Sequence, residues 1–333
     1  MSKVKWGLIG CGDIARKRVV SAIKNAENSE LIAISRANFL LAESFAGEFG
    51  IPNYYRYWQD LIKDKEIDAV YIATPVYLHI MQTVEAAFAG KHVLCEKPMA
   101  LNVHECDKMI DACSKNNVKL GVAYYRHFYP VIQKIKEILS SREIGEPKIV
   151  EINAFEWFNR RPGDPRYWLL EKRKSGGGVM MDFGCHRVEV LQNLFGKIKN
   201  IQSQIFNLHF EREVEDTAYV SLFFDDDVQA IIRVSNAVYE PKDTFDIYGT
   251  AGTIRTPVLN EGKLIISNKE GSRNEEFKPH QNLHQPLIED FAQAVLDNRE
   301  PAVSGVKGKE VSAVLEEIYE QEALARLFNR SKK

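Results

Sequence analysis

The stretch Val4-Lys5-Trp6-Gly7-Leu8-Ile9-Gly10-Cys11-Gly12-Asp13-Ile14-Ala15 decides the fold of this chain. It begins as a strand and continues into residues 14–25, which have the pattern of a helix. Its glycines match the G-x-G-x-x-A dinucleotide fingerprint: Gly10 permits a tight turn, Gly12 lets the backbone approach a pyrophosphate, and Ala15 packs the helix close to the strand. An ordinary glycine-rich turn is the alternative. The position between a strand and a helix favours a dinucleotide site, which would include Asp13 and Ile14.

The rest of the first third of the chain alternates buried apolar runs with helical patterns. Strands separated by helices of this length predict right-handed βαβ crossovers and a parallel sheet that is covered on both faces. We therefore expect residues 1–122 to form a Rossmann domain. The expected strands are 31–34, 69–73, 93–95 and 118–123, and the expected helices are 40–49, 79–90 and 106–116.

The pattern changes after residue 148, where strand-like runs follow one another with little helix between them. Several runs alternate apolar and polar residues, which is typical of an antiparallel sheet with one covered face. We expect residues 123–333 to form a second, α+β domain with a large open, mostly antiparallel sheet, so the fold class is α/β with two domains. The expected strands are 149–154, 201–210, 218–224, 228–234 and 245–248, followed by amphipathic helices at 287–296 and 311–327.

The second strand ends in Ser35-Arg36-Ala37-Asn38. An NAD-preferring site usually offers an acidic side chain at this point to bind the ribose 2′-hydroxyl. A hydroxyl followed by a guanidinium instead suits a 2′-phosphate, since charge-assisted hydrogen bonds contribute about 1.5–3 kcal/mol. The cofactor is therefore NADP or NAD, with NADP favoured, and a solvated arginine at a strand end is the alternative for Arg36.

The run Val93-Leu94-Cys95-Glu96-Lys97-Pro98 indicates a buried parallel strand that ends in a charged pair before a proline. Open α/β sheets bind their ligands at the carboxyl ends of the strands. We therefore expect Lys97 to face a bound ligand.

Three consecutive glycines, Gly176-Gly177-Gly178, precede a helical pattern that contains Asp182 and His186. A helix would place these two residues on one face, since they are four apart. A carboxylate beside an imidazole can orient it and stabilise its charged form, which suits His186 as a general base for an alcohol. A hydrogen-bonded pair on a helix surface is the alternative, and the triple glycine argues against it.

An aromatic and cationic segment, 123–130, follows the last expected Rossmann strand. Its position predicts that Tyr125 or Arg126 holds a polyol or an acid, although packing between domains would explain the same rings. The basic runs 160–161 and 172–174 suggest a phosphorylated or carboxylated substrate, but such runs are often simply solvated.

Composition excludes several classes of protein. With 333 residues and a net charge of −2, the chain has no basic excess for nucleic acid. It has no apolar run long enough to cross a bilayer and no signal-peptide core, so no membrane partner and a cytoplasmic location are expected. The five cysteines lack a Cys-x-x-Cys spacing. With only His280 and His284 as a candidate pair, we expect no metal site.

Taken together, these motifs resemble the Gfo/Idh/MocA oxidoreductases, the family of glucose-fructose oxidoreductase and inositol dehydrogenase. The resemblance extends over nearly the whole chain, and the Glu-Lys-Pro run together with Asp-x-x-x-His is its most specific part. The matching segments are 10–15, Ala73-Thr74-Pro75 with His79, Glu96-Lys97-Pro98, 176–178 with Asp182 and His186, and the tail 282–305.

The resemblance implies hydride transfer between NAD or NADP and a hydroxyl-bearing carbon of a sugar, a polyol or a related cyclic alcohol. It assigns Lys97 and His186 to catalysis with Asp182 as partner, Glu96 to the nicotinamide ribose, and Thr74, Pro75 and His79 to the cofactor. It also implies a homodimer or homotetramer. Trp168 is a further candidate for substrate binding, and the leucine that follows it replaces an arginine of many relatives.

Two other functions fit the same fold. An NAD-dependent glycoside hydrolase would oxidise its sugar transiently and regenerate the cofactor. A nucleotide-sensing regulator would have no chemistry, and the presence of Lys97, Asp182 and His186 together argues against it.

Overall fold

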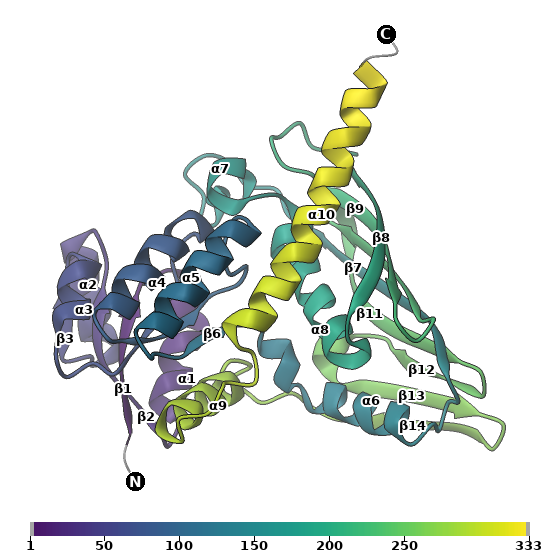
Figure 1. Ribbon diagram of the computed structural model, residues 1–333, viewed down its shortest axis with the longest axis horizontal. Coiled ribbons are helices and arrows are strands. Elements are labelled where there is room, and N and C mark those ends of the chain that lie inside the picture. Colours follow the sequence, from purple (N-terminus) through teal and green to yellow (C-terminus); the bar gives the residue numbers. More distant parts are fainter. Residues whose placement is uncertain (1–2, 331–333) are drawn as a thin grey trace. The chain divides into compact units, whose positions relative to one another are not determined.

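The computed structural model describes residues 3–330 and divides into two compact units (Figure 1). The first unit comprises Met1–Tyr125 and His280–Ser312, and the second comprises Arg126–Pro279 and Ala313–Lys333. The expected boundary at residue 122 therefore lies close to Tyr125, after which the chain passes from the first unit to the second. The expected second domain, in contrast, contains a segment, His280–Ser312, that packs with the first unit.

The first unit is built around a parallel sheet with the strand order β3-β2-β1-β4-β5-β6. This order, which reverses direction between β1 and β4, is that of the Rossmann fold. The predicted parallel sheet is confirmed. Its strands are β1 (Val4–Ile9), β2 (Ser29–Ser35), β3 (Asn53–Tyr55), β4 (Ala69–Ile72), β5 (His92–Cys95) and β6 (Leu120–Val122).

Helices pack against both faces of this sheet. On one face Trp6 lies against Phe291 of α9, with ring centroids 5.5 Å apart. On the other face a side chain at Gly7 would collide with Leu61 of α3. The helices are a π-helical turn, η1 (Ala15–Val19), that leads into α1 (Val20–Asn25), then α2 (Phe39–Phe49), α3 (Trp58–Lys63), α4 (His79–Phe88), α5 (Val103–Lys115) and α9 (Gln285–Leu296).

The second unit contains a larger sheet with the order β14-β13-β12-β11-β7-β10-β9-β8. The pair β7 and β10 is parallel, and the other neighbouring pairs are antiparallel. The predicted mostly antiparallel sheet is thereby confirmed. The strands are β7 (Pro147–Trp157), β8 (Ile198–Phe206), β9 (Thr217–Phe224), β10 (Gln229–Ser235), β11 (Ala237–Gly249), β12 (Gly252–Thr256), β13 (Lys263–Asn268) and β14 (Gly271–Glu276).

One face of the larger sheet is buried and the other is open. Along β7, Val150, Ile152 and Ala154 are buried, whereas Ile149 and Trp157 on the alternate positions are exposed. This alternation is expected where helices cover only one face. The α-helices with residues in this unit are α6 (Pro130–Ser140), α7 (Lys172–Ser175), α8 (Cys185–Phe195) and the part of α10 (Gly305–Arg330) that begins at residue 313.

The side chain of Gln321 in α10 also binds the edge strand β8. Gln321 donates to the carbonyl of Ile201 at 2.8 Å and accepts from the amide of Ser203 at 3.1 Å. These bonds attach the C-terminal helix to the sheet.

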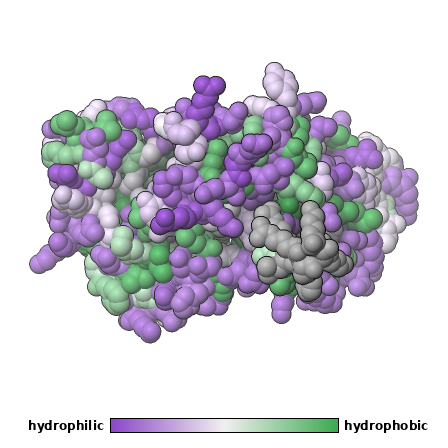
Figure 2. Space-filling view, turned by 90° about the horizontal axis from the view of Figure 1, so that it is seen from above, coloured by the Kyte–Doolittle hydropathy of each residue, from purple (hydrophilic) through white to green (hydrophobic). Residues whose placement is uncertain are grey.

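Hydrophilic residues cover most of the face seen in Figure 2, and hydrophobic residues occur there in smaller groups. Within residues 3–330, no helix combines the length and the apolar character needed to cross a bilayer.

Candidate functional site

The glycine turn after β1 has the shape that a dinucleotide requires. Gly10 has a φ of +95°, and a Cβ there would lie 2.8 Å from the carbonyl oxygen of Ala73, so glycine is needed for both conformation and space. A Cβ on Gly12 would meet no atom within 4 Å. The backbone at Gly12 therefore borders open space, as the close approach of a pyrophosphate demands.

The residues expected at the adenosine ribose lie beside this turn. Ser35 is buried, and its carbonyl accepts from the amide of Gly10 at 3.1 Å. A guanidinium nitrogen of Arg36 donates to the carbonyl of Cys11 at 3.1 Å. Arg36 is thus held at the glycine turn instead of extending into solvent.

His79 lies between two turns at the carboxyl edge of the sheet. Its Nε2 is 2.9 Å from the carbonyl oxygen of Thr74, and its Nδ1 is 3.1 Å from that of Pro98. Burial lowers the pKa of His79, although the surrounding carbonyls and the charge of Glu96 favour its protonation. The ring is fully buried and links the turn after β4 to the turn after β5. Its predicted contact with the cofactor stays a prediction.

Glu96 directly follows β5, and both of its carboxylate oxygens accept hydrogen bonds within the first unit. Oε1 accepts from the hydroxyl of Tyr71 at 2.8 Å, and Oε2 accepts from the amide of Lys97 at 3.1 Å. Burial by itself would raise the pKa of Glu96, but the interaction with His284, the charge of Lys97 and the Tyr71 hydrogen bond hold it below its ordinary value. In this arrangement Glu96 positions the backbone of Lys97, next to the cis peptide bond between Lys97 and Pro98.

His284 belongs to this cluster and was not predicted from the sequence. Its Nε2 lies 3.5 Å from Oε1 of Glu96, and its ring stacks on Tyr125 with centroids 4.7 Å apart. Burial lowers the pKa of His284 despite the nearby carboxylate. The sequence placed His284 in a possible metal pair with His280, four residues away as on a helix, and in the tail 282–305 that resembles the family, but gave it no role in the site. However, α9 begins after both, at Gln285.

In the second unit, two of the three glycines lie where side chains would collide. A Cβ on Gly177 would overlap the ring of Tyr319, and one on Gly178 would overlap the backbone oxygen of Glu215. The glycines therefore allow the chain to pass tightly against both Tyr319 and Glu215.

Asp182 and His186 follow these glycines, but the helix between them differs from the expected one. A π-helical turn, η5 (Met180–Gly184), precedes α8, and His186 lies in the first turn of α8. The expectation of a continuous α-helix with four-residue spacing was wrong here, since π-helical turns are wider and occur often at functional sites. His186 is buried, and a carboxylate oxygen of Asp182 accepts from Arg166 at 3.0 Å. Arg166 is a second residue that sequence reasoning missed.

The predicted substrate residues are distributed over both units. Tyr125 is in the first unit, where Arg18 lies over its ring at 5.2 Å. Arg126 is in the second unit and is buried. Trp168, also in the second unit, packs against an apolar cluster of Phe158, Leu169, Leu170 and Val214. Their contact with a substrate stays a prediction.

In the part of the chain that the structure describes, no group of three or more histidine, cysteine, aspartate or glutamate side chains is arranged to hold a metal ion. His280 instead pairs with the backbone of Asn282.

The fold and the glycine turn define a dinucleotide-binding Rossmann domain. A family model described as "Oxidoreductase family, NAD-binding Rossmann fold" matches residues 4–124, and one described as "GFO/IDH/MocA C-terminal domain" matches residues 132–255. The chain belongs to the Gfo/Idh/MocA family of oxidoreductases, as the sequence motifs predicted.

Known relatives cover nearly the whole chain. "Oxidoreductase P35" of Formosa agariphila is 31% identical over 86% of this chain and 89% of its own length. The 1,5-anhydro-D-fructose reductase of Ensifer adhaerens is 27% identical over 91% and 92%. The crystal structure of an aldose-aldose oxidoreductase from Caulobacter crescentus, complexed with glycerol, superposes with a TM-score of 0.88 at 26% identity, covering 97% of this chain and 98% of that one.

Proposed function

We propose that this enzyme transfers a hydride between a nicotinamide cofactor and a hydroxyl-bearing carbon of a sugar, a polyol or a related cyclic alcohol. The observation that best supports the proposal is the position of Lys97, at the carboxyl end of a parallel strand, with its backbone amide bound to the buried carboxylate of Glu96. This end of a Rossmann sheet is where ligands bind. The sugar reductase of Ensifer adhaerens, 27% identical, supports the substrate class.

The proposed mechanism uses three side chains. When bound, the nicotinamide supplies the hydride acceptor or donor. The ammonium group of Lys97 donates a hydrogen bond to the substrate oxygen and stabilises the negative charge that develops on it. A ring nitrogen of His186 accepts the hydroxyl proton during oxidation and returns it during reduction. Asp182, bound by Arg166, favours the charged form of His186.

Contacts beyond these three residues belong to the same proposal. Tyr125, Arg126 and Trp168 contact the substrate, and Thr74, Pro75 and His79 shape the cofactor site. Glu96 acts through the backbone of Lys97, as its hydrogen bonds suggest, in addition to the expected contact with the nicotinamide ribose.

For the cofactor we propose a preference for NADP over NAD. The support is the absence of an acidic residue in Ser35-Arg36-Ala37-Asn38 together with the bond from Arg36 to the glycine turn. In that position a guanidinium can bind a 2′-phosphate.

We also propose that the protein is a homodimer or homotetramer that pairs through the open face of the larger sheet. This face exposes the side chains of Ile149, Trp157 and Tyr219. Exposed aromatic and aliphatic side chains on one sheet face favour burial against a second copy. Size-exclusion chromatography with light scattering measures the mass, and a monomer at micromolar concentration would contradict this part.

The deciding experiment is a panel of sugars and polyols incubated with the purified protein and either NAD⁺ or NADP⁺, followed at the nicotinamide absorbance. Net NAD(P)H production with at least one alcohol is expected. Release of an aglycone from a glycoside without net NAD(P)H would identify the hydrolase instead. Tight nucleotide binding without turnover of any member of the panel would indicate a sensor.

A further inference from the structure

The segment that carries Asp182 and His186 is bound at its beginning by Glu215. Glu215 lies just before β9 and is buried. Its Oε2 accepts from the amide of Gly178 at 2.9 Å, and its Oε1 accepts from the amide of Met180 at 3.0 Å. The intervening amide, of Val179, lies 3.4 Å from the backbone oxygen of Glu215.

Three successive amides at the start of the helical segment therefore point at one residue. The first amides of any helix have no partner within the helix, and they must be satisfied from outside if they are buried. Here the bond from the amide of Asp182 to the carbonyl of Gly178 is an early bond within the segment, at 3.1 Å. Glu215 thus binds the amides that the helix itself leaves open, and its carboxylate faces the positive end of the helix.

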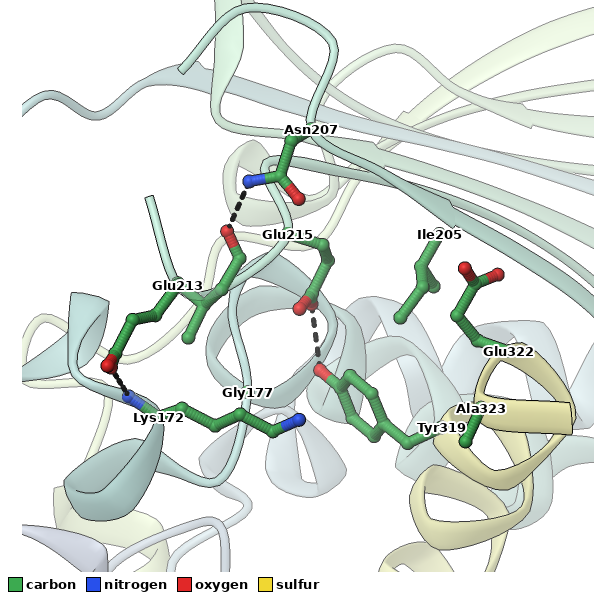
Figure 3. Close-up of a pocket in the computed structure, with 10 residues that line it drawn as sticks. Lys172, Gly177, Ile205, Asn207, Glu213, Glu215, Tyr319, Glu322 and Ala323 are labelled. Atoms are coloured by element: carbon green, nitrogen blue, oxygen red, sulfur yellow. Dashed lines mark hydrogen bonds between the residues drawn. The ribbon is translucent and has the colours of Figure 1, made fainter. Parts of the chain in front are cut away.

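Tyr319 of α10 completes the arrangement. Its hydroxyl donates to Oε1 of Glu215 at 2.7 Å, and Figure 3 shows the two side chains pointing toward one another. Both residues line a pocket of about 150 Å³. Burial, followed by the charge and hydrogen bond of Glu215, raises the pKa of Tyr319 well above its usual value. The hydroxyl therefore stays protonated and remains a donor.

The close fit of the glycines supports the same conclusion. Side chains at Gly177 and Gly178 would occupy the space of Tyr319 and Glu215. Gly177 and Gly178 are thus explained by the need for the backbone to approach this pair. The resulting contact fixes where the helical segment begins, four residues before Asp182 and eight before His186.

We infer that Glu215, supported by Tyr319, is a positioning residue that sets the location of Asp182 and His186 by binding the first amides of their segment. The inference rests on the proposed function for its effect on catalysis. The binding of the first amides by Glu215 is a feature of local structure, and it can be tested without any substrate.

The test compares Glu215→Gln with the matched control Glu213→Gln. Glu213 lies in the same loop, and its carboxylate accepts from the backbone amide of Lys172 at 3.0 Å, at the start of the short helix α7. Glutamine has nearly the same volume as glutamate. Its NH₂ group, however, would face one of the two backbone amides that the carboxylate binds, so that two hydrogen-bond donors would oppose each other. Tyr319→Phe removes only the hydroxyl that supports the carboxylate.

Hydrogen exchange, followed by mass spectrometry on peptides covering residues 177–186, provides the first measurement. In Glu215→Gln, exchange in this segment should become about tenfold faster or more, because a hydrogen bond to a charged group is lost. Tyr319→Phe should give a smaller increase, and Glu213→Gln none. Unchanged exchange in Glu215→Gln would overturn the inference, whether or not a substrate has been found.

Steady-state kinetics with a substrate from the panel provides the second measurement. Glu215→Gln should lower kcat by about tenfold or more while the Kd for the nucleotide stays within about twofold, since the glycine turn belongs to the other unit. The same kcat as the parent, with faster exchange, would overturn the role in positioning the catalytic residues. If no member of the panel is turned over, the proposed function is overturned. The hydrogen-exchange result then decides by itself whether Glu215 holds the start of the segment.

Discussion

Replacing Tyr71 with phenylalanine should lower the free energy of unfolding of the first unit, because the substitution removes one buried hydrogen bond. The ring is fully buried, and its hydroxyl donates to Oε1 of Glu96 at 2.8 Å. Because the pKa of Glu96 is held below its ordinary value, this acceptor is a carboxylate at neutral pH. Loss of a hydrogen bond to a charged group costs about 1.5–3 kcal/mol, and the removal of one oxygen leaves little cavity.

Hydrogen exchange of amides in β4 and β5 can measure this change for the first unit alone. A loss of about 1.5–3 kcal/mol corresponds to exchange that is about 10- to 150-fold faster for amides that open with the unit. Tyr55→Phe is the matched control, since its hydroxyl donates to Asp64 at 3.0 Å but is only partly buried. Its effect should be smaller, because solvent replaces the lost bond.

A double-mutant cycle separates the hydrogen bond from other effects of the substitution. In a Glu96→Gln background the acceptor is no longer charged, so Tyr71→Phe should cost about 1 kcal/mol less than in the parent. If Tyr71→Phe accelerates exchange no more than Tyr55→Phe, or if the cycle shows no coupling, the hydroxyl does not stabilise the carboxylate beside Lys97. The reasoning about that cluster would then be refuted.

Lys97→Met should lower kcat by about 100-fold or more with nucleotide affinity nearly unchanged, and equal turnover would remove the lysine from the mechanism. Arg36→Ala should raise the Kd for NADP⁺ about tenfold, with little change for NAD⁺ in a titration; equal changes for both would contradict the 2′-phosphate contact. Gly12→Ala should keep the parental melting temperature yet weaken nucleotide binding, because a Cβ there meets open space, whereas Gly10→Ala should lower the melting temperature as well. Burial keeps the pKa of His284 in the folded protein below its usual 6.5. As the pH falls below 6.5, His284 is therefore protonated in the unfolded chain before it is protonated in the folded protein, and the free energy of unfolding decreases. His284→Gln should make this loss shallower when the free energy of unfolding is measured against pH, and an unchanged slope would count against the buried neutral imidazole.

Several elements of the second unit were not predicted, for two different reasons. The outermost strand β14 (Gly271–Glu276) contains Ser272-Arg273-Asn274-Glu275-Glu276 and has no apolar pattern. Charged edge strands are favoured because they avoid pairing with other chains, so hydrophobic periodicity cannot find them. The helix α6 (Pro130–Ser140) does carry a signal, a proline at its start and isoleucines at helical spacing. It could have been found by reading that periodicity.

The segment from Gly178 to His186 shows what local sequence patterns cannot predict. The residue types Asp182 and His186, and the glycines before them, were recognised from the sequence alone. The π-helical turn between them was not, and neither were the partners Arg166, Glu215 and Tyr319, which are far away along the chain. Local patterns report the period of a helix, but they contain no information about which distant side chain satisfies its first amides.

The sequence by itself determined the Rossmann domain, the family and the residues that make up the family motifs. This was possible because a strand, a glycine turn and a helix are specified by residues that are close together along the chain. The tertiary structure alone decided what surrounds those residues. It brought His284 and Tyr71 to Glu96, and Tyr319 to Glu215. A buried charge or a buried amide must be satisfied by some polar group, but burial is a property of the folded chain, and only folding selects the group that does so.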